Sequence, residues 1–168
     1  SLDATARAVW QHACSILVQS AISQPQVWVH RDFMGRNLLV SEPNPGVIDF
    51  QDARMGPVTY DVVSLLRDAF YSFTPAEESQ YLAAYQSRAA AAGVPLPADL
   101  QRSVDLMGAQ RHLKVLGIFA RLCHRDEKPH YLRDAPRFFE YLARELAPYS
   151  DLGDLRRWLM ALPPGHSE

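Results

Sequence analysis

Two carboxylates and one amide stand at spacings that suit phosphoryl transfer. Asp32 and Asn37 lie five positions apart in a polar stretch, and Asp49 follows Asn37 by twelve positions. Transfer of a phosphoryl group from a nucleotide needs a carboxylate beside the acceptor hydroxyl and magnesium to neutralise the phosphate charge. Asp32 suits the first role, as catalytic base or as the group that orients the hydroxyl. Asn37 and Asp49 offer the oxygen ligands that Mg²⁺ prefers, so the pattern predicts Mg²⁺-dependent phosphoryl transfer.

Each of these residues taken alone has an ordinary structural explanation. An isolated loop aspartate such as Asp32 is usually a turn or cap residue. Asn37 follows Gly35-Arg36 and could serve a turn, and Asp49 could cap the end of a strand. The occurrence of all three in the expected order favours the catalytic interpretation.

Four neighbouring residues have less definite roles. Asp52 could reach the metal or cap the turn that follows it, and Asp61 could cap a helix or support the catalytic loop. Arg36 could approach a phosphate or a substrate hydroxyl, or be an exposed loop arginine. His30 more often holds the backbone in such loops than it exchanges protons, so it is not placed in the catalytic set.

Short strands and a long helical region must position these residues. A helix is expected over residues 4–23 with Asp3 as its cap, followed by short apolar strands over 27–29 and 38–40. The turn-forming stretch 42–46 predicts that the second strand pairs with residues 47–48 as a hairpin. No further strand is expected after this hairpin.

The remainder of the chain has a helical pattern. One apolar helix face is predicted from Val62, Leu65, Leu66, Ala69 and Phe70. Thr74, Pro75 and Glu77 form a helix start, and that helix is expected to run to about residue 92 and end at Gly93. A long helix is predicted over 98–124, and Pro129, Pro136 and Pro148 separate shorter helices that end with one over 152–162. The predicted fold class is α+β, mainly helical, with a small β-hairpin cluster that carries the catalytic loop.

Composition excludes some partners and favours one compartment. The 168 residues carry a formal net charge of −2, so no basic field attracts nucleic acid. No apolar run approaches the roughly 20 residues of a membrane span. Cys14 and Cys123 follow no metal-ligand spacing and are predicted to be buried free thiols in a cytoplasmic protein.

The motifs resemble those of a known family. His30–Asn37 reads H-R-D-x-x-x-x-N and Val47–Asp52 reads V-I-D-F-Q-D, a combination similar to the aminoglycoside phosphotransferase and choline kinase family. Met34 stands where a protein kinase carries its catalytic-loop lysine, which argues against a protein kinase. Within the family, 56–70, 108–121 and 131–138 most resemble the anomeric kinases of N-acetylmuramate and N-acetylglucosamine, which act in peptidoglycan recycling. The resemblance implies ATP-dependent phosphorylation of the sugar C1 hydroxyl, with Asp32 as base and with Asn37 and Asp49 as Mg²⁺ ligands.

A polar cluster interrupts the long apolar helix. Gln110, Arg111, His112 and Lys114 lie among residues that should be largely buried, which is costly unless they are paired or face a cavity. In one interpretation they form a sugar-binding wall, in which Arg111 pairs with a carboxylate such as the lactyl group of N-acetylmuramate. In the other they form internal salt bridges to Asp126, Asp134 or Glu140. The sequence does not favour either.

Enzymes of this family have two lobes, and the motifs of one lobe are missing before His30. No glycine-rich loop and no lysine-bearing strand precede it. Residues 1–168 are therefore expected to be a C-terminal lobe without its N-terminal nucleotide lobe, and to be inactive alone. Alternatives are a kinase for another small acceptor, such as an aminoglycoside, choline or homoserine, or an inactive lobe that acts as a binding module. Arg and His residues after Phe70 favour a neutral or anionic sugar over a polycation.

Overall fold

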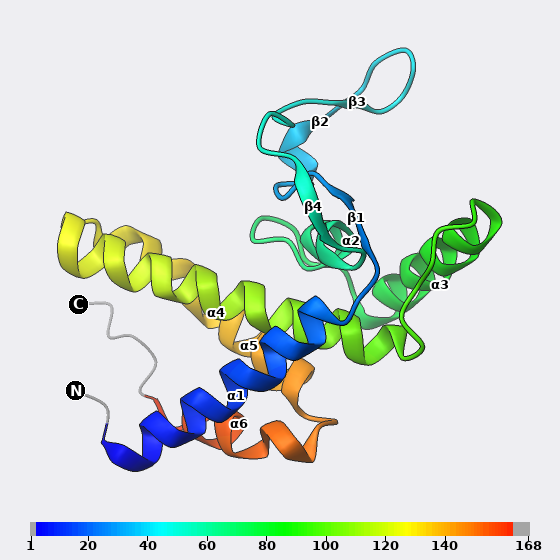
Figure 1. The fold of residues 1–168 in the computed structure, drawn as a ribbon. Coiled ribbons are helices and arrows are strands. Elements are labelled where there is room, and N and C mark those ends of the chain that lie inside the picture. The colour runs from blue at the N-terminus through cyan, green and yellow to red at the C-terminus, as the bar shows by residue number, and fades with distance from the viewer. Residues whose placement is uncertain (1–2, 163–168) are drawn as a thin grey trace. The chain divides into compact units, whose positions relative to one another are not determined.

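The computed structural model describes residues 3–162, which fall into two compact units. One unit combines the chain up to Ser20 with the chain from Asp105 onward, and the other comprises Ala21–Val104. Helices dominate, and the strands form two separate antiparallel pairs in the second unit (Figure 1). The predicted α+β, mainly helical fold class is confirmed.

The described part of the first unit contains helices and the turns that join them, and no strand. Its elements are most of α1 (Ala4–Ile22), most of α4 (Leu100–Asp126), the 3-10 helix η2 (Pro129–Asp134), α5 (Ala135–Leu146), the 3-10 helix η3 (Ser150–Leu152) and α6 (Gly153–Met160). These helices share one core of buried side chains, which are Ala13, Leu17, Leu106, Ala109, Leu142, Leu146, Leu152, Leu155 and Leu159. The apolar periodicity that predicted the helices therefore marks their buried faces.

Local sequence signals set the ends of the helices. Asp3 Oδ1 accepts a hydrogen bond from the Ala6 amide at 2.7 Å at the start of α1, as predicted. Thr74 and Glu77 form a complete capping box at the start of α3 (Pro75–Ala91), and Gly93 follows its end with a φ of +69°. Because these signals are local, the predicted bounds of these two helices differ from the observed ones by only a residue or so.

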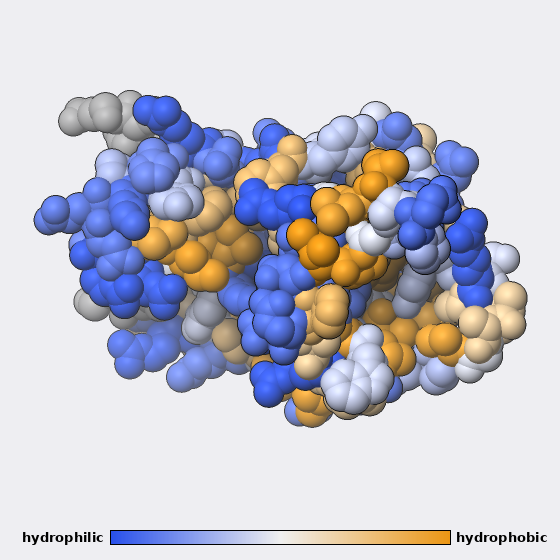
Figure 2. All heavy atoms as spheres, turned by 90° about the horizontal axis from the view of Figure 1, so that it is seen from above, coloured by the Kyte–Doolittle hydropathy of each residue, from blue (hydrophilic) through white to orange (hydrophobic). Residues whose placement is uncertain are grey.

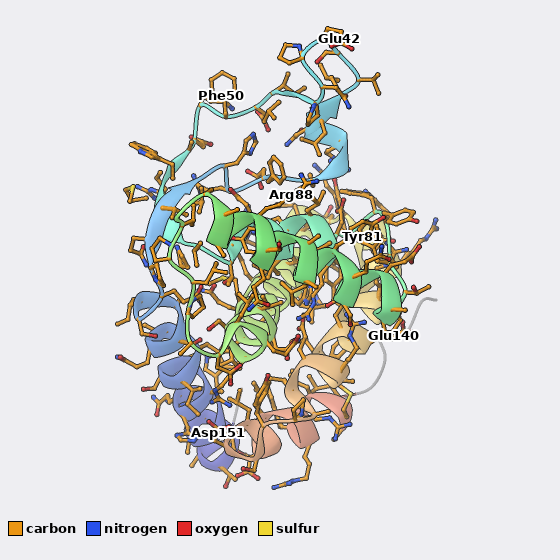
Figure 3. The ribbon with its side chains drawn as sticks, turned by 90° about the vertical axis from the view of Figure 1, so that its right-hand side faces the viewer. Glu42, Phe50, Tyr81, Arg88, Glu140 and Asp151 are labelled. Carbon is orange, nitrogen blue, oxygen red and sulfur yellow. The ribbon has the colours of Figure 1, made fainter. Side chains whose placement is uncertain are left out.

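The second unit carries all of the described strands. Its elements are β1 (Gln26–Val29), the 3-10 turn η1 (Gly35–Asn37), β2 (Leu38–Leu39), β3 (Gly46–Val47), β4 (Arg54–Pro57), α2 (Tyr60–Leu66) and α3. β2 and β3 pair antiparallel with Leu38 opposite Val47, so the predicted hairpin is confirmed. The loop of this hairpin, which includes Glu42, projects away from the β1–β4 pair (Figures 1 and 3).

The expectation that no strand follows the hairpin is wrong. β4 pairs antiparallel with β1 over four residues, with Val27 opposite Gly56. A Cβ atom at position 56 would lie 2.6 Å from Val29 Cγ2, so only glycine allows the two strands to approach this closely. Arg54-Met55-Gly56-Pro57 contains no β-branched or aromatic residue, and its pairing with a strand 28 positions earlier has no local signal.

The helix predicted after the hairpin is shorter than its apolar pattern suggested. α2 ends at Leu66, and Phe70 is 59% exposed rather than part of a buried face. Arg67 leaves the helical conformation with φ −122° and ψ 54°, and its guanidinium forms a buried ion pair with Glu78 of α3. The Nε–Oε1 and Nη2–Oε1 distances are 2.7 and 2.6 Å. This pair joins α2 to α3 and fixes the start of the segment between them.

Substitution Glu78→Gln is expected to lower the free energy of unfolding by about 3–5 kcal/mol, because it removes the carboxylate of a buried ion pair. The side chains of Arg67 and Glu78 are only 3% and 9% exposed, so water cannot replace the lost carboxylate. Denaturant titration of the Glu78→Gln protein against wild type measures the change. Asp126→Asn is the control, because it breaks the exposed Arg125–Asp126 pair and should leave stability unchanged. Equal effects of the two substitutions would contradict the prediction.

Within residues 3–162, no helix is both long enough and apolar enough to cross a bilayer.

Candidate active site

The backbone turns sharply where β1 ends, and Asp61 holds this turn. The Asp61 carboxylate accepts hydrogen bonds from the backbone amides of His30 at 2.6 Å and Arg31 at 3.0 Å. Arg31 has a φ of 80°, in the left-handed region that is unfavourable for a residue with a side chain. The Asp61 carboxylate thus contacts the loop that contains Asp32, and its support of a catalytic loop stays a prediction. Asp61 lies in the first turn of α2, so this helix holds the carboxylate in place.

Substitution Asp61→Asn is expected to loosen the loop without changing its sequence. An amide has one acceptor oxygen in place of two, and its NH₂ group would face a backbone donor. Hydrogen exchange at the His30 and Arg31 amides should become faster by about 10-fold or more, as expected for loss of a charge-assisted hydrogen bond. Asp99→Asn is the matched control, because Asp99 Oδ1 also accepts a backbone hydrogen bond, from Arg102 at 2.9 Å, at a helix start. Unchanged exchange in Asp61→Asn would remove Asp61 as the support.

The His30 ring ties the catalytic loop to the segment after β3. Its Nε2 lies 2.8 Å from the backbone oxygen of Ile48. A carbonyl only accepts hydrogen bonds, so Nε2 carries the proton and donates it. The buried Nδ1 has no hydrogen-bond partner among the described residues. These contacts give His30 a structural role, consistent with its place outside the predicted catalytic set.

The hairpin brings Asn37 and Asp49 together. Asn37 Nδ2 donates to the backbone oxygen of Asp32 at 2.8 Å and lies 3.5 Å from Asp49 Oδ2. The backbone of Asn37 is also fixed, because its oxygen accepts a hydrogen bond from the Ile48 amide at 3.1 Å. With its NH₂ group committed to these acceptors, Asn37 has Oδ1 as the atom available to a cation. The structure thus groups the three residues that the sequence pattern singled out.

Asp49 occupies a strained position. Its φ is 67°, again left-handed, and Gln51 Nε2 donates to its Oδ1 at 2.8 Å. Non-glycine residues in this region cost free energy and cluster at functional sites. Sequence reasoning did not assign a role to Gln51, although its place two positions after Asp49 was a usable signal.

The oxygen atoms of Asp49 and Asn37 suit a cation that binds oxygen ligands and that also keeps ligands from outside the protein. Asp49 supplies a carboxylate and Asn37 an amide oxygen, a combination that suits Mg²⁺ bound partly by substrate phosphates. In the part of the chain that the structure describes, no three His, Cys, Asp or Glu side chains are grouped to hold a metal. Asp32, Asp49 and Asp52 therefore do not form a three-carboxylate site. Asp52 instead contributes its backbone oxygen, which accepts from Arg31 Nη1 at 3.4 Å.

Tyr85 supports the site from α3. Its hydroxyl donates to the backbone oxygen of Val58 at 2.9 Å, between β4 and α2. Burial, and secondarily the negative charge of Asp61, raise the pKa of Tyr85 above its ordinary value. The hydroxyl therefore stays protonated and remains a donor at physiological pH.

Arg36 stacks on an aromatic ring. Its guanidinium carbon lies 3.6 Å from the centroid of the Phe70 ring. Both side chains are exposed, and Arg36 immediately precedes Asn37 in the 3-10 turn η1. The sequence pattern had placed Phe70 on a buried helix face, so this contact was not foreseen.

The polar cluster of α4 lies in the other compact unit, with Asp105–Glu168. Gln110 and Lys114 line a cavity of about 250 Å³, together with Trp10, Ala13, Cys14, Leu17, Val18 and Leu113. His112 is buried and its Nδ1 lies 3.0 Å from Glu145 Oε2, which is a partner that the sequence did not suggest. Arg111 is half-buried. A substrate role for Gln110, Arg111 and Lys114 stays a prediction.

Both cysteines are free and half-buried. Cys14 lies in the wall of the cavity beside α4, and burial raises the pKa of its thiol.

Comparison with known proteins points to one kind of enzyme. The sequence profile of a family described as "Phosphotransferase enzyme family" matches residues 1–100. The N-acetylmuramate/N-acetylglucosamine kinase of Pseudomonas aeruginosa is 54% identical over 98% of this chain and 49% of the relative. Proteins of the same name from Pseudomonas putida and Neisseria meningitidis are 51% and 45% identical over 95% and 93% of this chain, each over 48% of the relative. The chain spans about half the length of these curated relatives.

Proposed function

The chain belongs to the phosphotransferase enzyme family, and we propose that it supplies the catalytic loop of an ATP-dependent small-molecule kinase. The observation that carries the proposal is the hydrogen-bonded group of Asp32, Asn37 and Asp49. A binding module has no use for an amide and a carboxylate held 3.5 Å apart in a strained loop, whereas phosphoryl transfer needs both. The resemblance predicted from the motifs is confirmed by the profile and the relatives.

In this proposal Asp32 accepts or orients the proton of the acceptor hydroxyl. Asp32 is exposed, so an acceptor can reach it, and its backbone is fixed by Asn37. Holding the hydroxyl in line with the terminal phosphate is the main contribution a protein makes to this reaction. Asn37 Oδ1 and Asp49 would hold Mg²⁺, which when bound neutralises phosphate charge. Gln51 orients the Asp49 carboxylate through its hydrogen bond to Oδ1.

The acceptor we propose is an amino sugar. Three relatives that match over almost the whole chain are named N-acetylmuramate/N-acetylglucosamine kinases. By that similarity the phosphoryl group would go to the anomeric hydroxyl, with ATP as donor. Because ATP is supplied in the cytoplasm, we place the reaction there.

We also propose that residues 1–168 form the C-terminal lobe and that a nucleotide-binding lobe packs against the second unit. Large apolar side chains are exposed on its strands and the segments that join them, including Trp28 at 75%, Phe50 at 63% and Met55 at 53%. Figure 3 shows Phe50 pointing outward, and hydrophobic surface is visible among hydrophilic side chains in the view of Figure 2. Trp28 and Met55 are cross-strand partners, so their exposed side chains lie together, and exposed apolar patches usually mark an interface. The proposal fits relatives that are about twice as long.

The direct test is Mg²⁺-dependent ADP release by the full-length protein with four acceptors in parallel. These are N-acetylmuramate, N-acetylglucosamine, an aminoglycoside and choline. We expect turnover on the two amino sugars alone, with an acid-labile product. Turnover on another acceptor would keep the chemistry and reject the amino sugar. If no acceptor supports ADP release although the protein still binds nucleotide, a binding module is favoured.

A further inference from the structure

The segment between α2 and α3 is exposed and aromatic, yet both of its ends are fixed. Arg67 and Glu78 form the buried ion pair where the segment begins, and the Thr74 capping box fixes it where α3 starts. Within the segment, the Phe70 amide donates to Asp68 Oδ1 at 3.2 Å, and Asp68 is 5% exposed. A loop held at one end by a buried ion pair and at the other by an exposed capping box can present side chains at defined positions.

Aromatic contacts order the segment further. Tyr71 and Phe73 meet edge to face with ring centroids 4.7 Å apart, and Phe73 meets Tyr81 of α3 in the same way at 5.2 Å. Figure 3 shows Tyr81 at the surface of α3. Edge-to-face pairs of this kind favour one arrangement of the rings over others. Phe70 directly precedes this row in the chain, and its own amide is held by Asp68.

Phe70 contacts the loop that contains Asp32 and Asn37 through Arg36. The Arg36 guanidinium lies 3.6 Å from the Phe70 ring centroid, close enough for a cation–π interaction. Stacking occupies one face of the guanidinium and leaves the N–H donors at its edge available. Among the described residues, Arg36 has no ion-pair or hydrogen-bond partner, whereas Arg31 donates to the backbone of Asp52. Arg36 thus places beside Asn37 a positioned guanidinium that forms no ion pair with the described residues.

The charge of the surrounding loop makes this cation useful. The loop carries the carboxylates of Asp32, Asp49 and Asp52 within 21 positions, and those that are not bound to a cation repel an anionic acceptor. A neutral sugar is not repelled by these carboxylates. A sugar that carries a carboxylate is repelled, and it needs a nearby positive charge to offset the repulsion. A guanidinium with free edge donors matches a carboxylate in charge and in bidentate geometry.

We propose that Arg36 binds an acceptor carboxylate and that Phe70 is a positioning residue that holds Arg36 for this purpose. The inference rests on the proposed function, since it assumes an amino-sugar acceptor. Arg36 thereby determines preference for a carboxylated sugar, such as N-acetylmuramate, over the neutral N-acetylglucosamine. Phe70 acts only through Arg36 and does not contact the acceptor.

The test measures kcat/KM of the full-length protein for N-acetylmuramate and N-acetylglucosamine. Arg36→Ala should lower kcat/KM for N-acetylmuramate by about 10- to 100-fold through KM, the effect of losing a charged hydrogen bond, and change the neutral sugar by less than about 3-fold. Phe70→Ala should lower the N-acetylmuramate value by about 3- to 10-fold. Phe70→Tyr should restore it, because tyrosine offers the same ring face. The double variant should be no worse than Arg36→Ala.

Arg88→Ala is the matched control, because it removes an exposed arginine of α3 in the same unit and should leave both sugars unaffected. Equal losses on the two sugars, or additive losses in the double variant, would overturn the inference. Inactivity of the wild-type protein on both sugars would instead overturn the proposed function, and this inference with it. The two failures are therefore distinguishable.

Discussion

Asp32→Asn is expected to lower kcat of the full-length protein by about 10²- to 10⁴-fold, the range that general base catalysis contributes. An amide cannot accept the hydroxyl proton at neutral pH. The fold should be unaffected, because the contact that Asp32 makes with Asn37 uses its backbone oxygen, which the substitution preserves. ATP affinity should also stay within about 2-fold of wild type, since no phosphate contact is assigned to this side chain. Steady-state kinetics with N-acetylmuramate, together with ATP titration, measures both quantities.

Asp99→Asn serves again as the control for charge removal, because Asp99 lies at a helix start and is assigned no role in catalysis. It should retain wild-type kcat. Wild-type turnover in Asp32→Asn would rule out Asp32 as base. A parallel loss of stability would show that the side chain, and not only the backbone, supports the loop.

Asp49→Asn is expected to raise the Mg²⁺ concentration needed for half-maximal activity by about 100-fold or more. Loss of a residue that only orients a metal ligand already costs about 10- to 100-fold in metal affinity, and loss of a ligand should cost at least as much. Asparagine is the informative replacement because it tolerates the left-handed backbone, with φ at 67°, better than alanine does. The substitution therefore removes the charge without adding strain. Activity measured as a function of Mg²⁺ gives the shift.

Gln51→Ala provides the graded comparison for Asp49→Asn. It removes the 2.8 Å hydrogen bond to Asp49 Oδ1 but leaves the carboxylate in place, so a shift of about 10-fold is expected, at the low end of the range for a residue that orients a ligand. An unchanged Mg²⁺ requirement in Asp49→Asn would mean that Asp49 is not a ligand. If Gln51→Ala raised the Mg²⁺ requirement more than Asp49→Asn did, Gln51 would be the metal ligand and Asp49 the residue that orients it.

The sequence predicted those parts of the fold that depend on residues close to one another in the chain. The capping box of Thr74 and Glu77, the cap at Asp3 and the turn formers of the hairpin each act within a few residues. The spacing of Asp32, Asn37 and Asp49 was equally visible, because a hairpin returns the chain over a fixed length. The structure accordingly groups these residues as expected, while their catalytic roles stay proposals.

The parts that sequence missed depend on contacts between distant segments. β4 forms because glycine at position 56 admits Val29, and nothing in Arg54–Pro57 favours a strand by itself. α2 stops at Leu66 because Arg67 turns to reach Glu78, eleven positions away, so the apolar residues that follow are not carried onto a buried face. The stacking of Arg36 on Phe70 follows from this early end of α2. None of these contacts leaves a periodic pattern in the sequence.

Asp61 is an intermediate case. Its place near a helix start suggested a cap, and the alternative of loop support was visible only because the catalytic loop had already been recognised. The two hydrogen bonds to His30 and Arg31 span 31 and 30 positions, so their geometry required the structure.

The most direct test of the central claim is the ³¹P NMR spectrum of the product formed by the full-length protein from ATP, Mg²⁺ and N-acetylmuramate. The account predicts a sugar phosphate resonance coupled to the anomeric proton with wild-type protein, and none over the same period with Asp32→Asn. A phosphate on another hydroxyl would contradict the proposed acceptor position. Equal product from both proteins would contradict the claim that this loop carries the chemistry.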